Sequence, residues 1–238
     1  MTTQTAIGQQ RRSQPQEPAV SGRLAGAAGL IFAATLVVDN LIRASGPGIG
    51  APPAQVTEYF LHHRFAALVP LGLFAAGMPA FFPFIAAFWA RAKTERTRWQ
   101  AGTGALAAAT IAALFSVVTI TEIVLTAKAG SLAASPAVVQ ALWAMHGAAF
   151  GLDMAAIAVA LLGLSRAAAA MRLIPSWLAL AAWPAAACLL TASVFTVALV
   201  NGGPWLAVGT VGFVVWLVFV IIASISLLRS RPAPETAA

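Results

Sequence analysis

Six long apolar segments constrain this chain more than any other feature of its sequence. They cover about residues 24–43, 65–90, 101–127, 137–164, 177–200 and 205–228. About 20 mostly apolar residues are needed for a helix to cross the roughly 30 Å of hydrocarbon in a bilayer. The segments are continuously apolar rather than alternating, which excludes the strands of a membrane barrel, and lipid cannot satisfy backbone groups outside a helix. The sequence therefore predicts an all-α integral membrane bundle of six transmembrane helices.

The charge composition supports a membrane protein and argues against a nucleic-acid partner. Charged residues make up 9% of the chain and hydrophobic residues 60%, whereas about a quarter of an ordinary soluble domain is charged. The formal net charge of +7 would suggest nucleic acid in a soluble protein. Here the basic residues lie between apolar segments, and no basic stripe is interleaved with aromatic residues. We therefore expect membrane lipid, and no nucleic acid, as a partner.

The positions of lysine and arginine predict which side of the membrane each loop occupies. Of the 14 basic residues, three fall on the side opposite the termini, namely Arg43, Arg64 and Lys128. The others share the side of the termini: Arg11, Arg12, Arg23, Arg91, Lys93, Arg96, Arg98, Arg166, Arg172, Arg229 and Arg231. Short cytoplasmic loops carry an excess of basic residues. We therefore expect both termini in the cytoplasm and a multi-pass protein of the bacterial cytoplasmic (inner) cell membrane.

Polar segments flank the six spans at both ends of the chain. Residues 1–22 predict a disordered cytoplasmic tail, and residues 229–238 a second one, on either side of a membrane domain of residues 23–228. The pair Arg11-Arg12 is similar to the start of a twin-arginine signal. However, residues 24–43 are long enough to span and lack a convincing Ala-x-Ala cleavage site. We expect an uncleaved tail followed by a first spanning helix.

Ionisable side chains inside the spans are the candidates for function, because they are costly in hydrocarbon. Asp39 and Arg43 lie one helical turn apart near the outer end of the first span, where they can pair. Glu122 lies near the outer end of the third span, and His146 and Asp153 lie within the fourth. The catalytic residues are unknown from the sequence, but Glu122, His146 and Asp153 are the candidate acids and bases.

The short loop between the third and fourth spans predicts how these residues meet. It makes the two helices antiparallel neighbours, which places Glu122 level with about Gln140, and His146 level with about Val117. A polar pocket that opens outward between the first, third and fourth spans follows from this geometry. Its candidate ligand-binding residues are Asp39, Arg43, Glu122, Gln140 and His146. Residues 54–64 predict a short amphipathic helix that lies on the interface or caps the bundle.

The sequence predicts no metal site and no cofactor. His62, His63 and His146 are competent metal ligands, but no His-Glu-x-x-His motif or i, i+4 histidine pair fixes them together. Only His146 is deep enough to hold a membrane haem. Cys188 is the single cysteine, so no intramolecular disulfide can form. We interpret it as a small buried hydrophobe.

Two classes of function are open to such a chain. The first is a non-enzymatic membrane protein that binds a lipophilic small molecule or a membrane partner and could contribute to transport. Six spans are few for a transporter acting alone, so that role would imply a homo-oligomer, and the two halves show no repeat of the kind common in transporters. The second is an intramembrane enzyme, such as a cyclase or isomerase, that uses one or two buried acids on an apolar substrate.

Residues 172–179 have the sequence Arg-Leu-Ile-Pro-Ser-Trp-Leu-Ala. They resemble an Ile-Pro-x-Trp-Leu element found before the penultimate span in a bacterial family of small, uncharacterised multi-pass membrane proteins, a domain of unknown function. Members often also carry a histidine in the preceding helix, as at His146, and a tryptophan-rich last span, as at Trp205 and Trp216. The resemblance covers most of residues 24–228. It implies the fold and carries no catalytic residue across.

Overall fold

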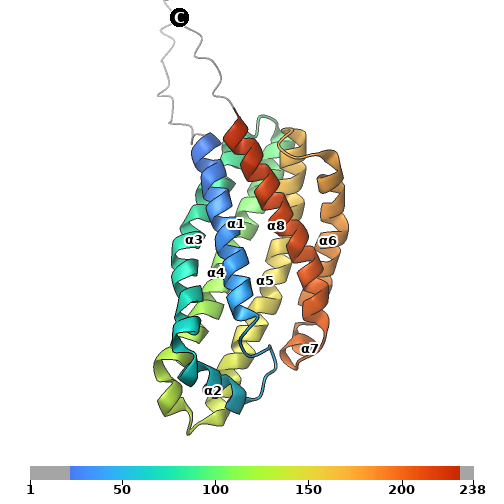
Figure 1. The fold of residues 1–238 in the computed structure, drawn as a ribbon. Coiled ribbons are helices and arrows are strands. Elements are labelled where there is room, and N and C mark those ends of the chain that lie inside the picture. Colours follow the sequence, from blue (N-terminus) through green and yellow to red (C-terminus); the bar gives the residue numbers. More distant parts are fainter. Residues whose placement is uncertain (1–21, 231–238) are drawn as a thin grey trace, which may run out of the picture.

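The computed structural model describes residues 22–230, and within that range it contains helices and no strand (Figure 1). The helices are α1 (Gly22–Arg43), α2 (Pro53–His62), α3 (Arg64–Arg91), α4 (Glu95–Leu132), α5 (Pro136–Ala170), α6 (Ser176–Val194), α7 (Thr196–Val200) and α8 (Trp205–Arg229). All of them except α2 and α7 are long and apolar enough to cross a membrane. The predicted all-α bundle of six membrane helices is confirmed, and the chain is a multi-pass membrane protein.

The first helix begins and the last helix ends at the same end of the bundle. α1 begins at Gly22 and α8 ends at Arg229 at the upper end in Figure 1, which we call the terminal end. The opposite end carries α2 and is called the α2 end. Apart from the residues at its borders, each predicted tail lies outside the described residues. The assignment of the terminal end to the cytoplasm remains a prediction from the charge distribution.

Five of the six predicted spans lie within single helices, some of which are longer than the span. α4 has 38 residues and α5 has 35, so both extend beyond their apolar segments. Thr94 caps the start of α4, since its hydroxyl accepts a hydrogen bond from the backbone N–H of Thr97 at 3.2 Å. This cap allows the helix to begin in a polar sequence, where apolar periodicity gives no signal.

The predicted fifth span, residues 177–200, is divided into two helices. α6 ends at Val194, and α7 begins at Thr196 after Phe195 has left the helical conformation, with φ −90° and ψ 24°. The ring of Phe195 stacks on Trp205 at the start of α8, with centroids 3.9 Å apart. This stacking connects the break in the helix to the first turn of the next one.

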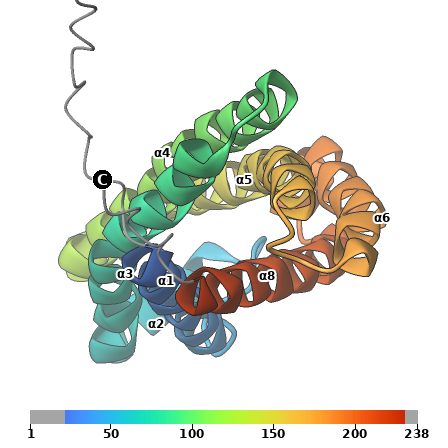
Figure 2. The same cartoon turned by 90° about the horizontal axis from the view of Figure 1, so that it is seen from above.

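The six long helices form two facing groups when the molecule is viewed along the bundle (Figure 2). α4 and α5 lie on one side, α3, α1 and α8 on the other, and α6 connects α5 with α8. The apolar segment of α5 is the most buried of the six. α5 is therefore the central helix, and side chains from several neighbours can meet those along its length.

Glycines on α1 bring it against α8 at the terminal end. A Cβ atom at Gly26 would lie 2.5 Å from the carbonyl oxygen of Ser224, and one at Gly22 would lie 2.9 Å from that of Leu227. Small residues permit such close helix contacts in membranes. Towards the α2 end the two helices diverge, as Figure 1 shows. The glycines thus close one half of the α1–α8 seam and leave the other half apart.

An aromatic core fills the bundle below this close contact. Phe81 lies in stacked contact with Phe32, with ring centroids 4.1 Å apart, and meets Trp216 edge-on at 6.1 Å. Phe88 and Phe219 continue the cluster towards the terminal end, with centroids 6.2 Å apart. Because these rings are fully or almost fully buried, they fill the space between α1, α3 and α8 towards the terminal end.

The α2 end is covered by the segment between α1 and α3. The predicted amphipathic helix is present as α2, whose Val56 and Phe60 are buried. The preceding loop is fixed in two places. The indole N–H of Trp143 donates to the carbonyl of Gly48 at 3.1 Å, and Gly50, with φ +84°, lies so close to Gly202 that a Cβ atom would be 2.5 Å from its nitrogen. The loop before α2 therefore contacts both α5 and the loop before α8.

Candidate functional site

A cavity of about 570 Å³ lies inside the α2 half of the bundle. Its walls come from α1, α3, α4, α5 and α8, with contributions from α2, the loop before it and Leu189 of α6. Most of the lining is apolar, and its polar side chains include Asn40, Arg43, Tyr59, Glu122, His146 and Asp153. The glycine contact of α1 and α8 and the aromatic core stand between this space and the terminal end.

Arg43 and two carboxylates form an ion-pair cluster at the α2 end of the cavity. The Nε atom of Arg43 donates to Oδ2 of Asp39 at 2.8 Å, four residues earlier on α1. Its Nη1 atom donates to Oε1 of Glu122 on α4. Asp39 is 2% exposed and Glu122 7%. The predicted pairing of Asp39 with Arg43 is present, and Glu122 joins the same guanidinium.

His146 on α5 approaches the same carboxylate oxygen. Its Nδ1 atom lies 3.7 Å from Oε1 of Glu122 and has no hydrogen-bond partner among the described residues. The imidazole ring stacks on Trp143, with centroids 4.3 Å apart and an interplanar angle of 14°. Glu122 thus lies between a guanidinium and an imidazole, an arrangement that could bind a polar group or exchange a proton.

Aromatic rings support the cation of this cluster. The guanidinium carbon of Arg43 lies 5.4 Å from the ring centroid of Phe115 on α4, within the range of a cation–π interaction. Phe74 on α3 in turn stacks on Phe115, with the two ring centroids 5.3 Å apart. One nitrogen of Arg43, Nη2, is buried without a hydrogen-bond partner among the residues described.

Asp153 occupies a different part of the cavity. It lies seven residues after His146 on α5, which corresponds to about 10 Å along the helix axis. The residue is 3% exposed, and within residues 22–230 its carboxyl group makes no hydrogen bond or ion pair. Its cavity neighbours on α5 include Phe150 and Met154. Asp153 is therefore a lone carboxyl group in an apolar region.

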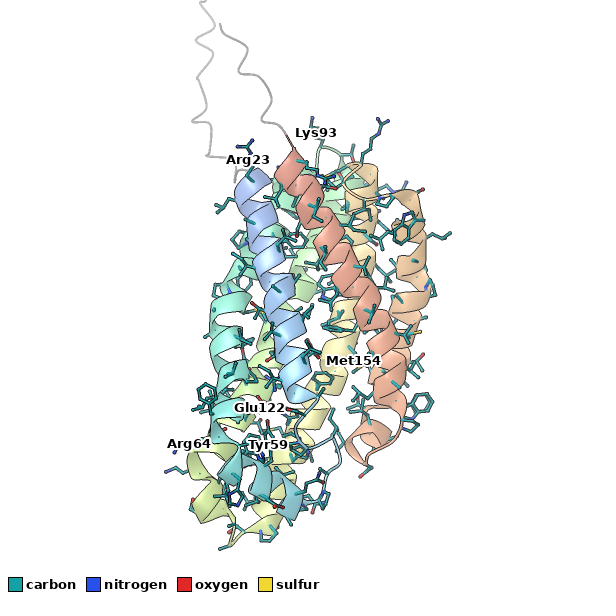
Figure 3. All side chains as sticks on the ribbon, in the orientation of Figure 1. Arg23, Tyr59, Arg64, Lys93, Glu122 and Met154 are labelled. Atoms are coloured by element: carbon teal, nitrogen blue, oxygen red, sulfur yellow. The ribbon has the colours of Figure 1, made fainter. Side chains whose placement is uncertain are left out.

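Tyr59 on α2 places a hydroxyl group over the ion-pair cluster. Burial raises the pKa of Tyr59 above its ordinary value of 10.0, and the negative charge of Glu122 raises it further, while Arg43 lowers it. Figure 3 shows Tyr59 and Glu122 near the α2 end, with Met154 further along the bundle. The phenol is neutral at physiological pH and can donate a hydrogen bond.

The structure brings together four of the five predicted ligand-binding residues and leaves out Gln140. Asp39, Arg43, Glu122 and His146 form the cluster, and all of them except Asp39 line the cavity. Gln140 is exposed on α5 and does not line the cavity. The cause is the register of α4 and α5. α4 continues to Leu132 and α5 begins at Pro136, so Glu122 lies level with His146 rather than with Gln140.

The sequence does not predict two contributions to the site. Tyr59 enters the cavity from α2, and α8 contributes Phe213 and Trp216. The spacing of Phe213 and Trp216 puts both on one face of a helix, which was the only available signal. No pattern in the sequence shows that this face meets the polar residues of α5.

The cavity opens sideways, between α1 and α8. Four apolar side chains both line the cavity and are exposed on the side of the bundle. They are Val37 and Leu41 of α1 and Leu206 and Val214 of α8. Leu41, for example, is 69% exposed. These side chains belong to membrane-spanning helices. The opening therefore faces the lipid phase rather than the ends of the bundle.

Neither the possible metal ligands nor the single cysteine adds a second site. The structure has no group of three or more His, Cys, Asp or Glu side chains suited to a metal ion within the part of the chain that it describes. Cys188, which the sequence predicts to be buried, is a free cysteine of only intermediate burial on α6. The candidate site is thus the cavity with its two polar regions.

No family model, curated protein or solved structure matches the chain. The likeness of residues 172–179 to a bacterial family therefore remains a prediction. The structure gives this element a local role, because Pro175 precedes the first turn of α6 and Trp177 is exposed at its start. Function must be derived from the cavity itself.

Proposed function

We propose that the protein binds a lipophilic small molecule in the cavity between α1, α4, α5 and α8. The observation that carries this proposal is an apolar space of about 570 Å³ with a buried cluster of Arg43, Glu122 and His146 at one end. Ligand sites are commonly apolar clefts of about 300–1,000 Å³ with a few placed polar groups. The ligand's polar group would meet the cluster, and its apolar part would fill the remaining space.

The cluster is costly for a membrane bundle, which supports a role beyond packing. Charged side chains buried among apolar groups lose their hydration, and their mutual attraction often only compensates for that loss. The aromatic core around Phe81 and Trp216 already packs the bundle without polar groups. Ionisable residues inside a membrane protein are therefore interpreted first as parts of a functional site.

The lateral opening supports access from the bilayer. The loop held by Trp143 covers the α2 end, and the contact at Gly26 closes α1 against α8 at the terminal end. Between them, the exposed lining residues Leu41 and Val214 leave a path to lipid. A molecule dissolved in the membrane could enter by this path without crossing water.

The proposal also includes the location of the protein. Under the positive-inside rule, the terminal end lies in the cytoplasm and the α2 end on the outer side of a bacterial cytoplasmic membrane. The lateral opening then lies in the outer half of the bilayer. The basic residues Arg91 and Arg229 at the terminal end of α3 and α8 support this orientation.

Acid–base catalysis on an apolar substrate is a second candidate function. It is favoured by the 3.7 Å separation of His146 Nδ1 and Glu122 Oε1, because both side chains line the cavity. An isomerase or cyclase could use this pair to move a proton on the bound molecule. If so, membranes from Glu122→Gln cells lose a product that wild-type membranes contain, although the variant protein folds and still binds.

Blocking the opening tests ligand binding. Thr210 of α8 is exposed and lines the cavity, whereas its neighbour Val211 is exposed and does not line it. We expect purified wild-type protein and Val211→Trp to yield the same lipophilic molecule on solvent extraction, and Thr210→Trp to yield much less. Equal yields from all three proteins would contradict binding in this cavity.

A further inference from the structure

We infer that the ligand is a lipophilic amine, an apolar molecule with a protonated nitrogen, and that the carboxylate of Asp153 binds this nitrogen. The inference rests on the proposed function, because it names the chemical class of molecule that the cavity takes. The ligand would then have two polar contacts, one with Asp153 and one with the cluster at the α2 end.

Asp153 is placed to contact a ligand and has no partner among residues 22–230. It lines the cavity, is 3% exposed, and its Oδ1 atom is buried without a hydrogen bond. Buried polar groups in proteins are almost always hydrogen-bonded, and an unpaired carboxylate in an apolar site is especially costly. A ligand group bound at Asp153 would remove this deficit.

The charges around the cavity favour a cation over an anion. Glu122 and Asp153 line the cavity, and the buried Asp39, which does not line it, pairs with the lining residue Arg43. Arg43 and His146 are the only basic side chains among the described residues that line the cavity. Arg43 is engaged by both Asp39 and Glu122. An anionic ligand would therefore add to an existing excess of acidic groups, whereas a cation would balance it.

The surroundings of Asp153 suit an organic ammonium better than a metal ion. Hard metal cations take six or more oxygen ligands, but the cavity-lining side chains next to Asp153 on α5 are Phe150, Met154 and Ile157, which supply none. The rings of Phe213 and Trp216 line the same cavity. Aromatic faces attract cations, organic ammonium groups included.

A neutral alternative makes a different prediction. If Asp153 keeps its proton, the carboxylic acid donates a hydrogen bond, and a hydroxyl group on the ligand would serve as its partner. An alcohol would then bind as well as the amine of the same chain length. Comparison of the two head groups therefore distinguishes a cation site from a hydrogen-bond site.

The test uses three probes of equal chain length with full-length protein in phosphatidylcholine nanodiscs. Dodecylamine is cationic, dodecanol is neutral and dodecanoate is anionic, and binding above that of empty nanodiscs is measured for each. The variants are Asp153→Asn and, as a matched control, Glu58→Gln, which removes a carboxylate from an exposed residue of α2. Thr210→Trp blocks the opening.

We expect saturable binding of one dodecylamine per chain, at least about tenfold tighter than that of dodecanol, because hydrogen bonds to charged groups are the stronger ones. Asp153→Asn should lose this advantage, so that both probes bind alike, while Glu58→Gln behaves as wild type. Equal binding of amine and alcohol to the wild-type protein would overturn the amine assignment and leave the proposed function intact.

Failure of the proposed function has a different signature. Suppose that none of the three probes binds the wild-type protein saturably, and that the Thr210→Trp variant retains as much of each probe as the wild type does. The cavity would then not be a ligand site. If Asp153→Asn does not fold, Asp153→Glu replaces it, since a carboxylate at this position should keep the preference for the amine. Loss of that preference in a folded Asp153→Glu protein that binds dodecanol normally would also count against the inference.

Discussion

Arg43 on α1 and Glu122 on α4, 79 positions apart in the sequence, form a hydrogen-bonded ion pair inside the bundle. The same guanidinium holds Asp39 at 2.8 Å. One cation therefore connects two buried carboxyl groups from different helices. This unequal cluster borders the cavity, and its acidic excess leads to a clear order of effects among substitutions.

Removal of Arg43 should destabilise the protein far more than removal of the charge on Glu122. Arg43→Gln leaves two buried carboxyl groups without a cation and should cost about 3–5 kcal/mol, as expected for a broken buried pair. Glu122→Gln leaves the neutral pair of Asp39 and Arg43 and should cost only about 1 kcal/mol, the net contribution of one hydrogen bond. Unfolding by a denaturing detergent, followed by circular dichroism, gives both free energies.

The double variant provides the control for that order. Adding Glu122→Gln to Arg43→Gln should recover part of the lost stability, because one of the two unpaired carboxylates is removed. Strictly additive losses would mean that the two side chains do not interact in the folded protein.

Gly26 should tolerate no side chain, whereas Gly72 should. At Gly26 a Cβ atom would lie 2.5 Å from a backbone oxygen of α8, while at Gly72 on α3 nothing lies within 4 Å. Gly26→Ala should therefore destabilise the protein by about 1–3 kcal/mol through overpacking. Gly72→Ala should be neutral or slightly stabilising, since alanine favours the helix.

The same unfolding assay compares the two glycine variants. Similar stability changes in Gly26→Ala and Gly72→Ala would contradict the close contact between α1 and α8. Together with the aromatic core, that contact separates the cavity from the terminal end of the bundle.

Tyr59 should titrate above pH 10. It is the single tyrosine of the chain, so the ultraviolet absorbance of the phenolate reports on it alone. Its raised pKa arises from burial and then from the charge of Glu122, with Arg43 opposing. Glu122→Gln should lower the midpoint and Arg43→Gln should raise it.

The stability should follow the same titration. Because the pKa is higher in the folded chain, the unfolded chain loses its phenolic proton first, and this contribution to stability falls as the pH rises through about 10. An unshifted midpoint in the folded wild-type protein would show that the hydroxyl of Tyr59 lies in water rather than over the cluster.

Reporter fusions test the orientation. A reporter active only in the periplasm should be inactive after Arg96, at the terminal end of α4, and active after Ser135, between α4 and α5. The positive-inside rule makes this prediction from the basic residues that surround Arg96. Reporter activity after Arg96 would show that the bundle has the opposite orientation to the one predicted.

The sequence predicts the helices much better than it predicts their contacts. Apolar length alone identifies the six long helices, and the spacing of Asp39 and Arg43 correctly predicts their pairing, because both depend on local geometry. Which residue of α5 lies beside Glu122 depends on where α4 ends. Lys128, Gly130 and Ser131 weaken the apolar pattern before the helix stops at Leu132. Hydropathy therefore predicts an end of α4 that is too early in the sequence.

The wall from α8 illustrates a different limit. Phe213 and Trp216 line the cavity opposite residues of α5 that lie more than fifty positions earlier in the chain. Such contacts depend on which faces pack together in three dimensions. The glycines of α1 are what bring α8 into place, and their effect on the cavity is visible only once the helices are assembled.

Native mass spectrometry of the protein released gently from its own membrane tests the central claim most directly. A lipophilic ligand predicts a discrete added mass on the 24.4 kDa chain that persists in Val211→Trp and is lost in Thr210→Trp. A wild-type chain that carries only bulk phospholipid, with the same spectrum for all three proteins, would contradict the account.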